Sequence, residues 1–314
     1  MTFATLKSDF IIVANKSESN RLYNNGFIGT FTKNRLKLSL IEACYLLENK
    51  KIEIKGQNFI SLFQYSALSN AKFGTNYYVY RDLKNKGYKV TVQETRFETL
   101  KDGKPKVVIA YDLGTFVKFD KILEQVKEHE EHIIAVIDED LEITYFLVSR
   151  ANLKGEFKID IENCIIGTLL EKNVILEGAK EIGAFGKKSG SLITLSLLES
   201  EYLLEKGILK LRGYSADEFL LYAKERDVLF DLKYKVYKKM TDNGLFLKAG
   251  FKFGTDFRAY AKNLKDHAEY LVHIFFRDEN MGDIARGVRL AHGVNKNLIL
   301  TDGNEFIQIA WYHP

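Results

Sequence analysis

Three residues in the last quarter of the chain could together cleave a phosphodiester without a metal ion. Tyr260, His267 and Lys296 lie in the stretch FKFGTDFRAYAKNLKDHAEYLVHIFFRDENMGDIARGVRLAHGVNK, residues 251–296. In RNA, such cleavage takes a proton from the 2′-hydroxyl, gives one to the 5′-oxygen and stabilises a crowded, anionic phosphorane. A histidine suits proton donation near neutral pH, and a lysine supplies a point charge. A tyrosine can accept a proton when cations lower its ordinarily high pKa or when the transfer is concerted.

Each of the three residues falls at the boundary of a predicted element. Three strands and a helix are predicted over residues 257–260, 269–275, 297–301 and 281–292. Tyr260 ends the first strand, His267 precedes the second, and Lys296 follows the helix at the start of the third. Because the ends and starts of elements can meet at one edge of a sheet, these side chains could converge there.

The same residue types also have ordinary structural interpretations. A lone tyrosine usually packs in a core, and His267, in the polar run LKDHAEY, could be a solvated turn residue. His273 alternates with apolar neighbours and is interpreted as a histidine on a sheet face. The run EQVKEHEEH (124–132) is typical of a solvated helix face, and GAFGKKSGS (183–191) of a loop between strands. The histidines show no metal-ligand spacing, so no metal and no cofactor are predicted.

The chain contains an internal repeat. Residues 38–56 (LSLIEACYLLENKKIEIKG) and 195–213 (LSLLESEYLLEKGILKLRG) are identical at nine of nineteen positions, at an offset of 157. The offset is unchanged between YYVYRDLKNKGYKV (77–90) and KYKVYKKMTDNGLFL (233–247), and it drifts to about 164 near the ends. The period is too long for a solenoid and indicates a duplicated domain.

Each repeat predicts the same order of elements. A serine, Ser39 or Ser196, begins an amphipathic helix, and a second helix, over about 71–86 or 217–243, ends at a glycine. Strands, a further helix and a final strand pair follow. This order predicts a mixed α/β (α+β) fold of two tandem homologous repeats. Only the second repeat has a histidine at the His267 position, so the first is predicted to be structural and the second active.

Composition sets broad limits on the class of protein. The chain has 314 residues, 46% hydrophobic and 28% charged, with a net charge of +4 and a pI near 8.7. The hydrophobic and charged fractions are typical of a globular protein. The mild positive net charge is compatible with a polyanionic partner but does not require one. Two cysteines, predicted to lie in apolar surroundings, and the lack of a long apolar run indicate a reduced, cytoplasmic protein without a membrane segment.

The combined motif resembles the tRNA-splicing endonuclease family. The family's run similar to GFKFGSDFxxY stands here as GFKFGTDFRAY (250–260), followed by His267 before EYLVHI, then GVRLA (287–291) and VNK (294–296). The resemblance covers essentially the whole chain. It implies that each repeat has a small N-terminal α/β subdomain and a nuclease-like subdomain with a central mixed sheet. The implied domains are a structural repeat at 1–150, an N-terminal subdomain at 151–215 and a catalytic subdomain at 216–314.

The resemblance also implies an activity and its residues. Tyr260 would be the general base, His267 the general acid and Lys296 the stabiliser of the transition state. The substrate would be precursor tRNA with a bulge-helix-bulge, cut without a metal to leave 2′,3′-cyclic phosphate and 5′-hydroxyl ends. The residue after the histidine is often serine in the family and is Ala268 here. A non-catalytic RNA-binding or structural subunit of the same fold is the alternative, and a metal-dependent nuclease would require clustered acids.

Two further features are implied by the resemblance. Members with a duplicated chain form homodimers, in which an acidic loop of the structural copy enters a basic cleft of the partner. That loop corresponds here to Asp138, Glu139, Asp140, Leu141 and Glu142, which otherwise form a solvated hairpin turn.

The family also holds a bulge base between two arginines. These positions correspond here to Arg289 and, by ungapped counting from Lys296, to Trp311, whose indole could stack on a base or simply pack.

Overall fold

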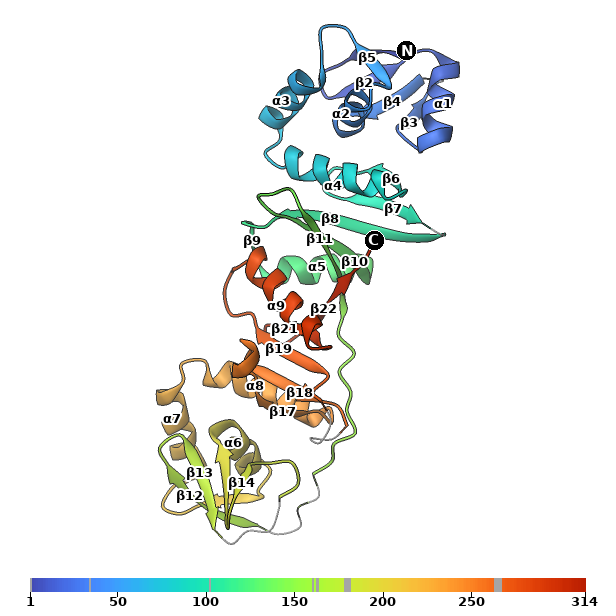
Figure 1. The fold of residues 1–314 in the computed structure, drawn as a ribbon. Coiled ribbons are helices and arrows are strands. Elements are labelled where there is room, and N and C mark those ends of the chain that lie inside the picture. The colour runs from blue at the N-terminus through green and yellow to red at the C-terminus, as the bar shows by residue number, and fades with distance from the viewer. Residues whose placement is uncertain are drawn as a thin grey trace. The chain divides into compact units, whose positions relative to one another are not determined.

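Two compact units make up the chain, which is described by a computed structural model. The described residues are 2–33, 35–101, 103–159, 161, 164–177, 182–262 and 267–314 (Figure 1). The first unit comprises Met1–Ser149, Glu279–Ala285 and Ala310–Pro314, and the second comprises Arg150–Asp278 and Arg286–Ile309. Each unit has its own hydrophobic core.

The first unit begins with a small α/β subdomain. Its sheet has the order β3-β4-β2-β1-β5, with β1 and β5 parallel and the other neighbours antiparallel. The elements are β1 (Thr2–Leu6), β2 (Phe10–Val13), α1 (Lys16–Gly26), β3 (Thr30–Thr32), β4 (Arg35–Ser39), α2 (Leu40–Glu48), β5 (Ile52–Ile54) and α3 (Phe59–Ser69).

A larger sheet follows in the same unit, in the order β6-β7-β8-β10-β11. Only the β8–β10 pair is parallel. The elements are α4 (Phe73–Asn85), β6 (Lys89–Val92), β7 (Phe97–Lys101), β8 (Lys104–Asp112), β9 (Phe116–Val117), α5 (Phe119–His129), β10 (Glu131–Ile137), β11 (Ile143–Arg150) and β20 (Glu279–Asn280), which pairs with β9.

The second unit repeats this plan. Its small sheet has the order β14-β15-β13-β12-β16, and its larger sheet runs β17-β18-β19-β21-β22 with only β19 and β21 parallel. The elements of the second repeat are β12 (Ile165–Leu170), β13 (Asn173–Glu177), β14 (Lys187–Ser189), β15 (Leu192–Ser196), α6 (Leu197–Glu205), β16 (Leu209–Leu211), α7 (Ala216–Arg226), α8 (Phe230–Asp242), β17 (Phe246–Ala249), η1 (Phe251–Phe253), β18 (Phe257–Tyr260), β19 (Tyr270–Ile274), α9 (Met281–Gly293), β21 (Asn297–Thr301) and β22 (Phe306–Tyr312). The beginning of α9, up to Ala285, and the end of β22, from Ala310, belong to the first unit.

The offset of 157 is visible element by element. It relates α2, α3 and α4 to α6, α7 and α8, and it relates β6 to β17, residue for residue at both ends. The serines behave as predicted: Ser39 and Ser196 each accept a hydrogen bond from the backbone N–H of a glutamate three residues later, and the carboxylate of that glutamate accepts the serine backbone N–H. This capping box satisfies otherwise unpaired amides at a helix start. The predicted mixed α/β fold of two homologous repeats is thus confirmed.

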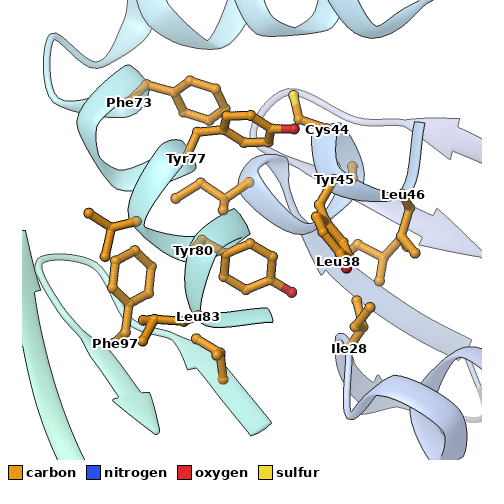
Figure 2. Close-up of a cluster of buried hydrophobic side chains, with 14 of the residues drawn as sticks. Ile28, Leu38, Cys44, Tyr45, Leu46, Phe73, Tyr77, Tyr80, Leu83 and Phe97 are labelled. Atoms are coloured by element: carbon orange, nitrogen blue, oxygen red, sulfur yellow. The ribbon is translucent and has the colours of Figure 1, made fainter. Parts of the chain in front are cut away.

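Tyrosines from the repeated helices fill equivalent places in the two cores. Figure 2 shows Tyr80 of α4 facing Tyr45 of α2, and their ring centroids lie 5.6 Å apart at 82°. The counterparts in the second unit, Tyr202 and Tyr237, lie 5.9 Å apart at 71°. Such edge-to-face pairs contribute beyond their burial, so the same contact holds the small subdomain to the larger one in each repeat.

Some local predictions were wrong. The single helix expected over 217–243 is two helices, α7 and α8, because Asp227 adopts an extended conformation (φ −143°) and its carboxylate accepts the Leu229 N–H. The run 124–132 is only partly helical, and His132 is fully buried in β10. Part of the expected loop 183–191 is strand β14.

Cysteine burial and membrane segments were also predicted from the sequence. Cys44 is buried, but Cys164 is exposed, contrary to prediction. No helix in the described part of the chain is long and apolar enough to cross a membrane.

Candidate active site

The ends of β18 and β19 bring Tyr260 next to Glu269. The two strands are antiparallel, and their last pair is Ala259 with Tyr270. One residue further, the Glu269 N–H donates to the Ala259 carbonyl at 3.0 Å, and the Ala261 N–H donates to a Glu269 carboxylate oxygen at 2.9 Å. Tyr260 therefore lies opposite Glu269 at the edge of the sheet.

The start of β21 brings Lys296 to the other side of Glu269. Strands β19 and β21 are parallel, and Tyr270 is paired with Asn297. The Asn297 N–H donates to the Glu269 carbonyl at 3.1 Å, so Lys296 lies beside Glu269 in register. Side chains of neighbouring paired residues point to the same face of a sheet. Tyr260, Glu269 and Lys296 thus lie side by side on three neighbouring strands and on one face of the sheet. They lie where β18 ends and where β19 and β21 begin, and this border of the sheet is the edge referred to below.

His267 lies on the segment that enters this edge. It is exposed and precedes Glu269 by two residues, a distance of roughly 7 Å along an extended chain. Residues 263–266 lie outside the described part of the chain, so the segment is described from His267 onward. The predicted catalytic residues therefore belong to one unit and to one edge of its sheet.

The surroundings of Tyr260 and Lys296 differ in burial. Tyr260 is 8% exposed, and the guanidinium carbon of Arg258 lies 5.9 Å from its ring centroid. Lys296 is half-buried, and its ammonium group donates to the Val294 carbonyl at 3.4 Å. Its backbone N–H is bound to the Ala291 carbonyl at the end of α9, which fixes the turn that carries it.

Two charged residues of this edge were missed from the sequence. Arg258 precedes Tyr260 by two residues and so shares its face, and Glu269 separates Tyr260 from Lys296. The two-residue spacing in FRAY was a signal that could have identified Arg258. Glu269 could be identified only from the strand register, which brings residues 260, 269 and 296 together.

Helix α9 packs closely on β21 through a glycine. A Cβ at Gly287 would lie 3.2 Å from Leu298 Cδ2, so a larger residue would push the helix outward. Val288 and Ala291 are buried beneath the helix, whereas Arg289 is exposed. The predicted base-binding arginine is therefore accessible on the helix that leads to Lys296.

The second predicted base-binding residue belongs to the other unit. Trp311 is half-buried near the end of β22, and its ring lies 5.9 Å from the Phe146 ring at 85°. This edge-to-face contact gives the indole at least a packing role in the first unit. Arg289 belongs to the second unit.

The acidic segment is a hairpin turn between β10 and β11. One Asp138 carboxylate oxygen accepts the Asp140 and Glu142 N–H groups at 3.0 and 2.9 Å, and Leu141 adopts a left-handed conformation (φ 63°). Glu139, Asp140 and Glu142 are exposed. No described residue forms an ion pair with these carboxylates, so the turn presents negative charge to solvent.

Strand register also identifies the equivalent positions in the first repeat. Phe97 pairs with Val108 as Phe257 pairs with Val272. Counting from these pairs and from the parallel pairs of β10 and β21, the first-repeat positions that match Tyr260, His267 and Lys296 are Leu100, Gly103 and Glu130. Leu100 and Gly103 have no titratable side chain, and Glu130 has the charge opposite to that of Lys296, so these three positions do not repeat the set of a base, an acid and a cation.

Sequence comparisons agree with the duplication. The profile "tRNA intron endonuclease, N-terminal domain" matches residues 3–63 and 165–220, and the profile "tRNA intron endonuclease, catalytic C-terminal domain" matches residues 230–305. The tRNA-splicing endonuclease of Methanococcoides burtonii is 32% identical, with 98% of each chain covered. That of Methanosarcina barkeri is 33% identical, with 94% of this chain and 93% of the relative covered. That of Thermococcus kodakarensis is 39% identical over 41% of this chain and 80% of its own.

Proposed function

This chain belongs to the tRNA intron endonuclease family, and we propose that it cuts introns out of precursor tRNA at bulge-helix-bulge junctions, without a metal ion. The observation that carries the proposal is the register of β18, β19 and β21, which brings Tyr260 and Lys296 to either side of Glu269 with His267 two residues away. An acid, a base and a cation at one edge are the groups that RNA transesterification needs.

The proposed chemistry assigns one task to each residue. Tyr260 accepts the proton of the 2′-hydroxyl as its oxygen attacks the adjacent phosphorus. His267 donates a proton to the 5′-oxygen as the bond from phosphorus to that oxygen breaks. Lys296 stabilises the negative charge on the non-bridging oxygens of the phosphorane. The products are a 2′,3′-cyclic phosphate and a 5′-hydroxyl, and no water enters this step.

A cation lies beside the proposed base, Tyr260. A tyrosine that accepts a proton must pass through a form with phenolate character, which a neighbouring cation stabilises. Arg258 lies beside the Tyr260 ring and shares its face. Glu269 opposes this effect electrostatically, but its carboxylate already accepts the Ala261 N–H. We therefore assign Arg258 to positioning and polarising Tyr260.

The proposed substrate follows from what such an edge can reach. The deep major groove of an RNA duplex excludes side chains, whereas unstacked bases and bent backbones of bulges are accessible. Exposed Arg289, on the helix that precedes Lys296, would stack on one bulge base, and Trp311 would provide the second flat surface. The domains at 1–150, 151–215 and 216–314 would then act as structural repeat, N-terminal subdomain and catalytic subdomain.

A homodimer is the proposed assembly, because one chain has one complete edge and a bulge-helix-bulge has two cleavage sites. The exposed acidic turn of Asp138, Glu139, Asp140 and Glu142 would bind a basic surface of a second copy. Charged contacts of this kind contribute orientation more than raw affinity.

The test is to incubate the protein with a short bulge-helix-bulge RNA in EDTA and to identify both new ends. Cleavage with 2′,3′-cyclic phosphate and 5′-hydroxyl ends is expected. Tyr260→Phe, which removes only the hydroxyl, should bind the RNA and cut it slowly. Strict dependence of the chemical step on added Mg²⁺ would contradict the proposal. RNA binding without any cleavage would favour a non-catalytic RNA-binding subunit.

A further inference from the structure

A polar cavity of about 450 Å³ lies in the first unit, the repeat that lacks the catalytic residues. Its walls come from the connection between α3 and α4, the start of α4, the turn between β6 and β7, the strand β8 and the helix α5. The side chains that give it chemical character are Lys72, Asn76, Arg96, Tyr111, Lys121 and Gln125. Its size lies within the range of pockets that hold small organic ligands, roughly 300–1,000 Å³.

Tyr111 and Gln125 leave hydrogen-bonding capacity unused in the wall of this cavity. Tyr111 is 2% exposed, and its hydroxyl oxygen accepts a hydrogen bond from Gln125 Nε2 at 2.8 Å. The Gln125 carbonyl oxygen is buried and meets no donor within the described part of the chain. If the amide were turned over, the carbonyl would accept the Tyr111 proton and Nε2 would be left unpaired instead. One amide group is thus available to a ligand in either orientation.

Such unused polar groups are unfavourable in a folded protein. A buried donor or acceptor without a partner costs about 1–3 kcal/mol. Arg96 Nε, which also belongs to the wall, is likewise buried without a partner among the described residues. A ligand that presents both hydrogen-bond donors and acceptors would recover this cost.

The charges around the cavity favour an anion. Arg96 is paired with Glu128 at 2.9 Å, which neutralises both. Lys72 and Lys121 form no ion pair with a carboxylate in the described residues, and the Lys72 ammonium lies 5.9 Å from the Tyr111 ring centroid. Exposed Glu94 is the remaining acid of the wall. Two free cations against one acid leave a positive balance at the cavity.

The fold alone does not require the polar side chains of this cavity, because the second repeat has the same fold and different residues at the equivalent positions. At the offset of 157, Asn70 and Asn76 correspond to Asp227 and Lys233, which form an ion pair at 2.6 Å. The strand register that matches Val108 to Val272 also matches Tyr111 to Phe275, which has no hydroxyl. The second repeat therefore has an ion pair and an apolar ring at these positions, whereas the first repeat has two amides and a hydroxyl.

We propose that this cavity binds a nucleotide, with Lys72 and Lys121 at its phosphate and Gln125, Tyr111 and Asn76 at the polar edge of its base. A 5′-mononucleotide combines an anion, a flat ring and paired donors and acceptors in a size that suits the cavity. The N-terminus of α4, where Lys72 makes no side-chain cap, adds a positive backbone field at the phosphate. The nucleotide comes either from solution or from an unpaired stretch of RNA.

Calorimetric titration of the full chain with each of the four 5′-mononucleotides tests this inference independently of RNA cleavage. At least one should bind, and its nucleoside should bind more weakly. Lys72→Ala should weaken binding by roughly tenfold, the effect of losing one charge-assisted contact. Tyr111→Phe and Gln125→Ala should each weaken it several-fold. Lys127→Ala, an exposed lysine on the same helix as Gln125 but outside the cavity wall, is the matched control and should change nothing.

Competition then distinguishes the two sources of the nucleotide. An unpaired oligoribonucleotide that displaces the bound mononucleotide would identify RNA as the source, and failure to displace it would identify the free nucleotide. The inference is overturned if none of the four nucleotides binds at millimolar concentration. It is also overturned if inorganic phosphate binds as tightly as the nucleotides, or if Lys127→Ala weakens binding as much as Lys72→Ala.

Discussion

The same pair of strands is joined by two residues in the first repeat and by a longer stretch of sequence in the second. In the first repeat, β7 and β8 remain paired up to Lys101 and Lys104. In the second, pairing of β18 and β19 ends at Ala259 and Tyr270, and the chain between them carries His267. The two repeats thus keep the same strand pairing and differ in the connection that, in the second repeat, carries the proposed proton donor.

The two edges also differ in charge. The position of Lys296 in the second repeat is occupied by Glu130 in the first, a full reversal at the same register. A carboxylate there would repel the phosphate that an ammonium group attracts. The first repeat, in turn, carries the polar cavity that includes Asn76 and Tyr111, whose counterparts in the second repeat are the ion-paired Lys233 and the apolar Phe275. Each repeat thus has polar chemistry that the other lacks.

Loss of the proposed proton donor, His267, is expected to have the largest effect on the rate of cleavage. His267→Ala should slow single-turnover cleavage by roughly 10²–10⁴-fold, the usual contribution of a general acid, with RNA affinity nearly unchanged. A substrate whose 5′-bridging oxygen is replaced by sulfur should restore most of the rate, because a thiolate leaves without protonation. If that substrate is cut as slowly as the ordinary one, His267 is not the acid.

A buried histidine should make the stability of the first repeat depend on pH in a way that the second repeat does not share. His132 is fully buried in β10. Its pKa is lowered to about 4, mainly by burial and to a lesser extent by the charge of the neighbouring His129. Its position in the second repeat is occupied by Leu298, which is also buried. The unfolded chain binds the proton near pH 6.5, so the stability associated with neutral His132 is complete above that pH and is lost as the pH falls toward 4.

The expected loss is about 3 kcal/mol of unfolding free energy for the unit that contains His132. Urea unfolding between pH 7 and pH 4 measures it. His132→Leu, which copies the second repeat, should remove most of this pH dependence. A variant that keeps the full wild-type slope would show that other groups cause it.

The proposed base-binding pair has a smaller expected effect. Arg289→Ala and Trp311→Ala should each reduce cleavage of bulged RNA by about 1–3 kcal/mol in transition-state free energy, the value of stacking on one base. The double variant should lose less than the sum, because both residues would hold the same base. Trp311→Phe should keep most of the activity. Wild-type rates for folded Trp311→Ala would leave the indole with only its packing against Phe146.

The acidic turn is expected to have the smallest effect, a change in the free energy of dimer formation. Asp138 shapes the turn by accepting two backbone N–H groups, so reversing Glu139 and Asp140 to lysine while keeping Asp138 tests charge alone. Sedimentation should show a shift from dimer toward monomer. Glu305→Lys, in the equivalent turn of the second repeat, is the matched control. Equal behaviour of the two variants would show that the acidic turn of the first repeat has no special role.

Much of the repeat architecture could be predicted because its signals are local. Ser39 and Ser196 with their glutamates determine helix starts over four residues, and Gly87 and Gly244 have the left-handed conformation (φ 85° and 81°) that glycine tolerates after a helix. The break at Asp227 was missed because its cause is one side-chain hydrogen bond, without proline or glycine to signal it.

The candidate site could be predicted only in part. The boundaries that carry Tyr260 and Lys296 were readable from periodicity, and the structure has both at those boundaries. The position of Glu269 between them depends on strand register, which pairs residues far apart in the chain. For the same reason Leu100 and Glu130 could not be recognised as counterparts, since the sequence offset drifts where the two connections differ in length.

The central claim is that one edge of the second repeat, and not its counterpart in the first, performs the cleavage. The most direct measurement compares Lys296→Ala with Glu130→Ala, two truncations at the same register position, in single-turnover cleavage of one bulge-helix-bulge RNA in EDTA. Lys296→Ala should slow cleavage by roughly 10²–10³-fold, as expected for loss of one group that stabilises the transition-state charge. Glu130→Ala should cut at the wild-type rate. Equal rates for the two variants would contradict the claim.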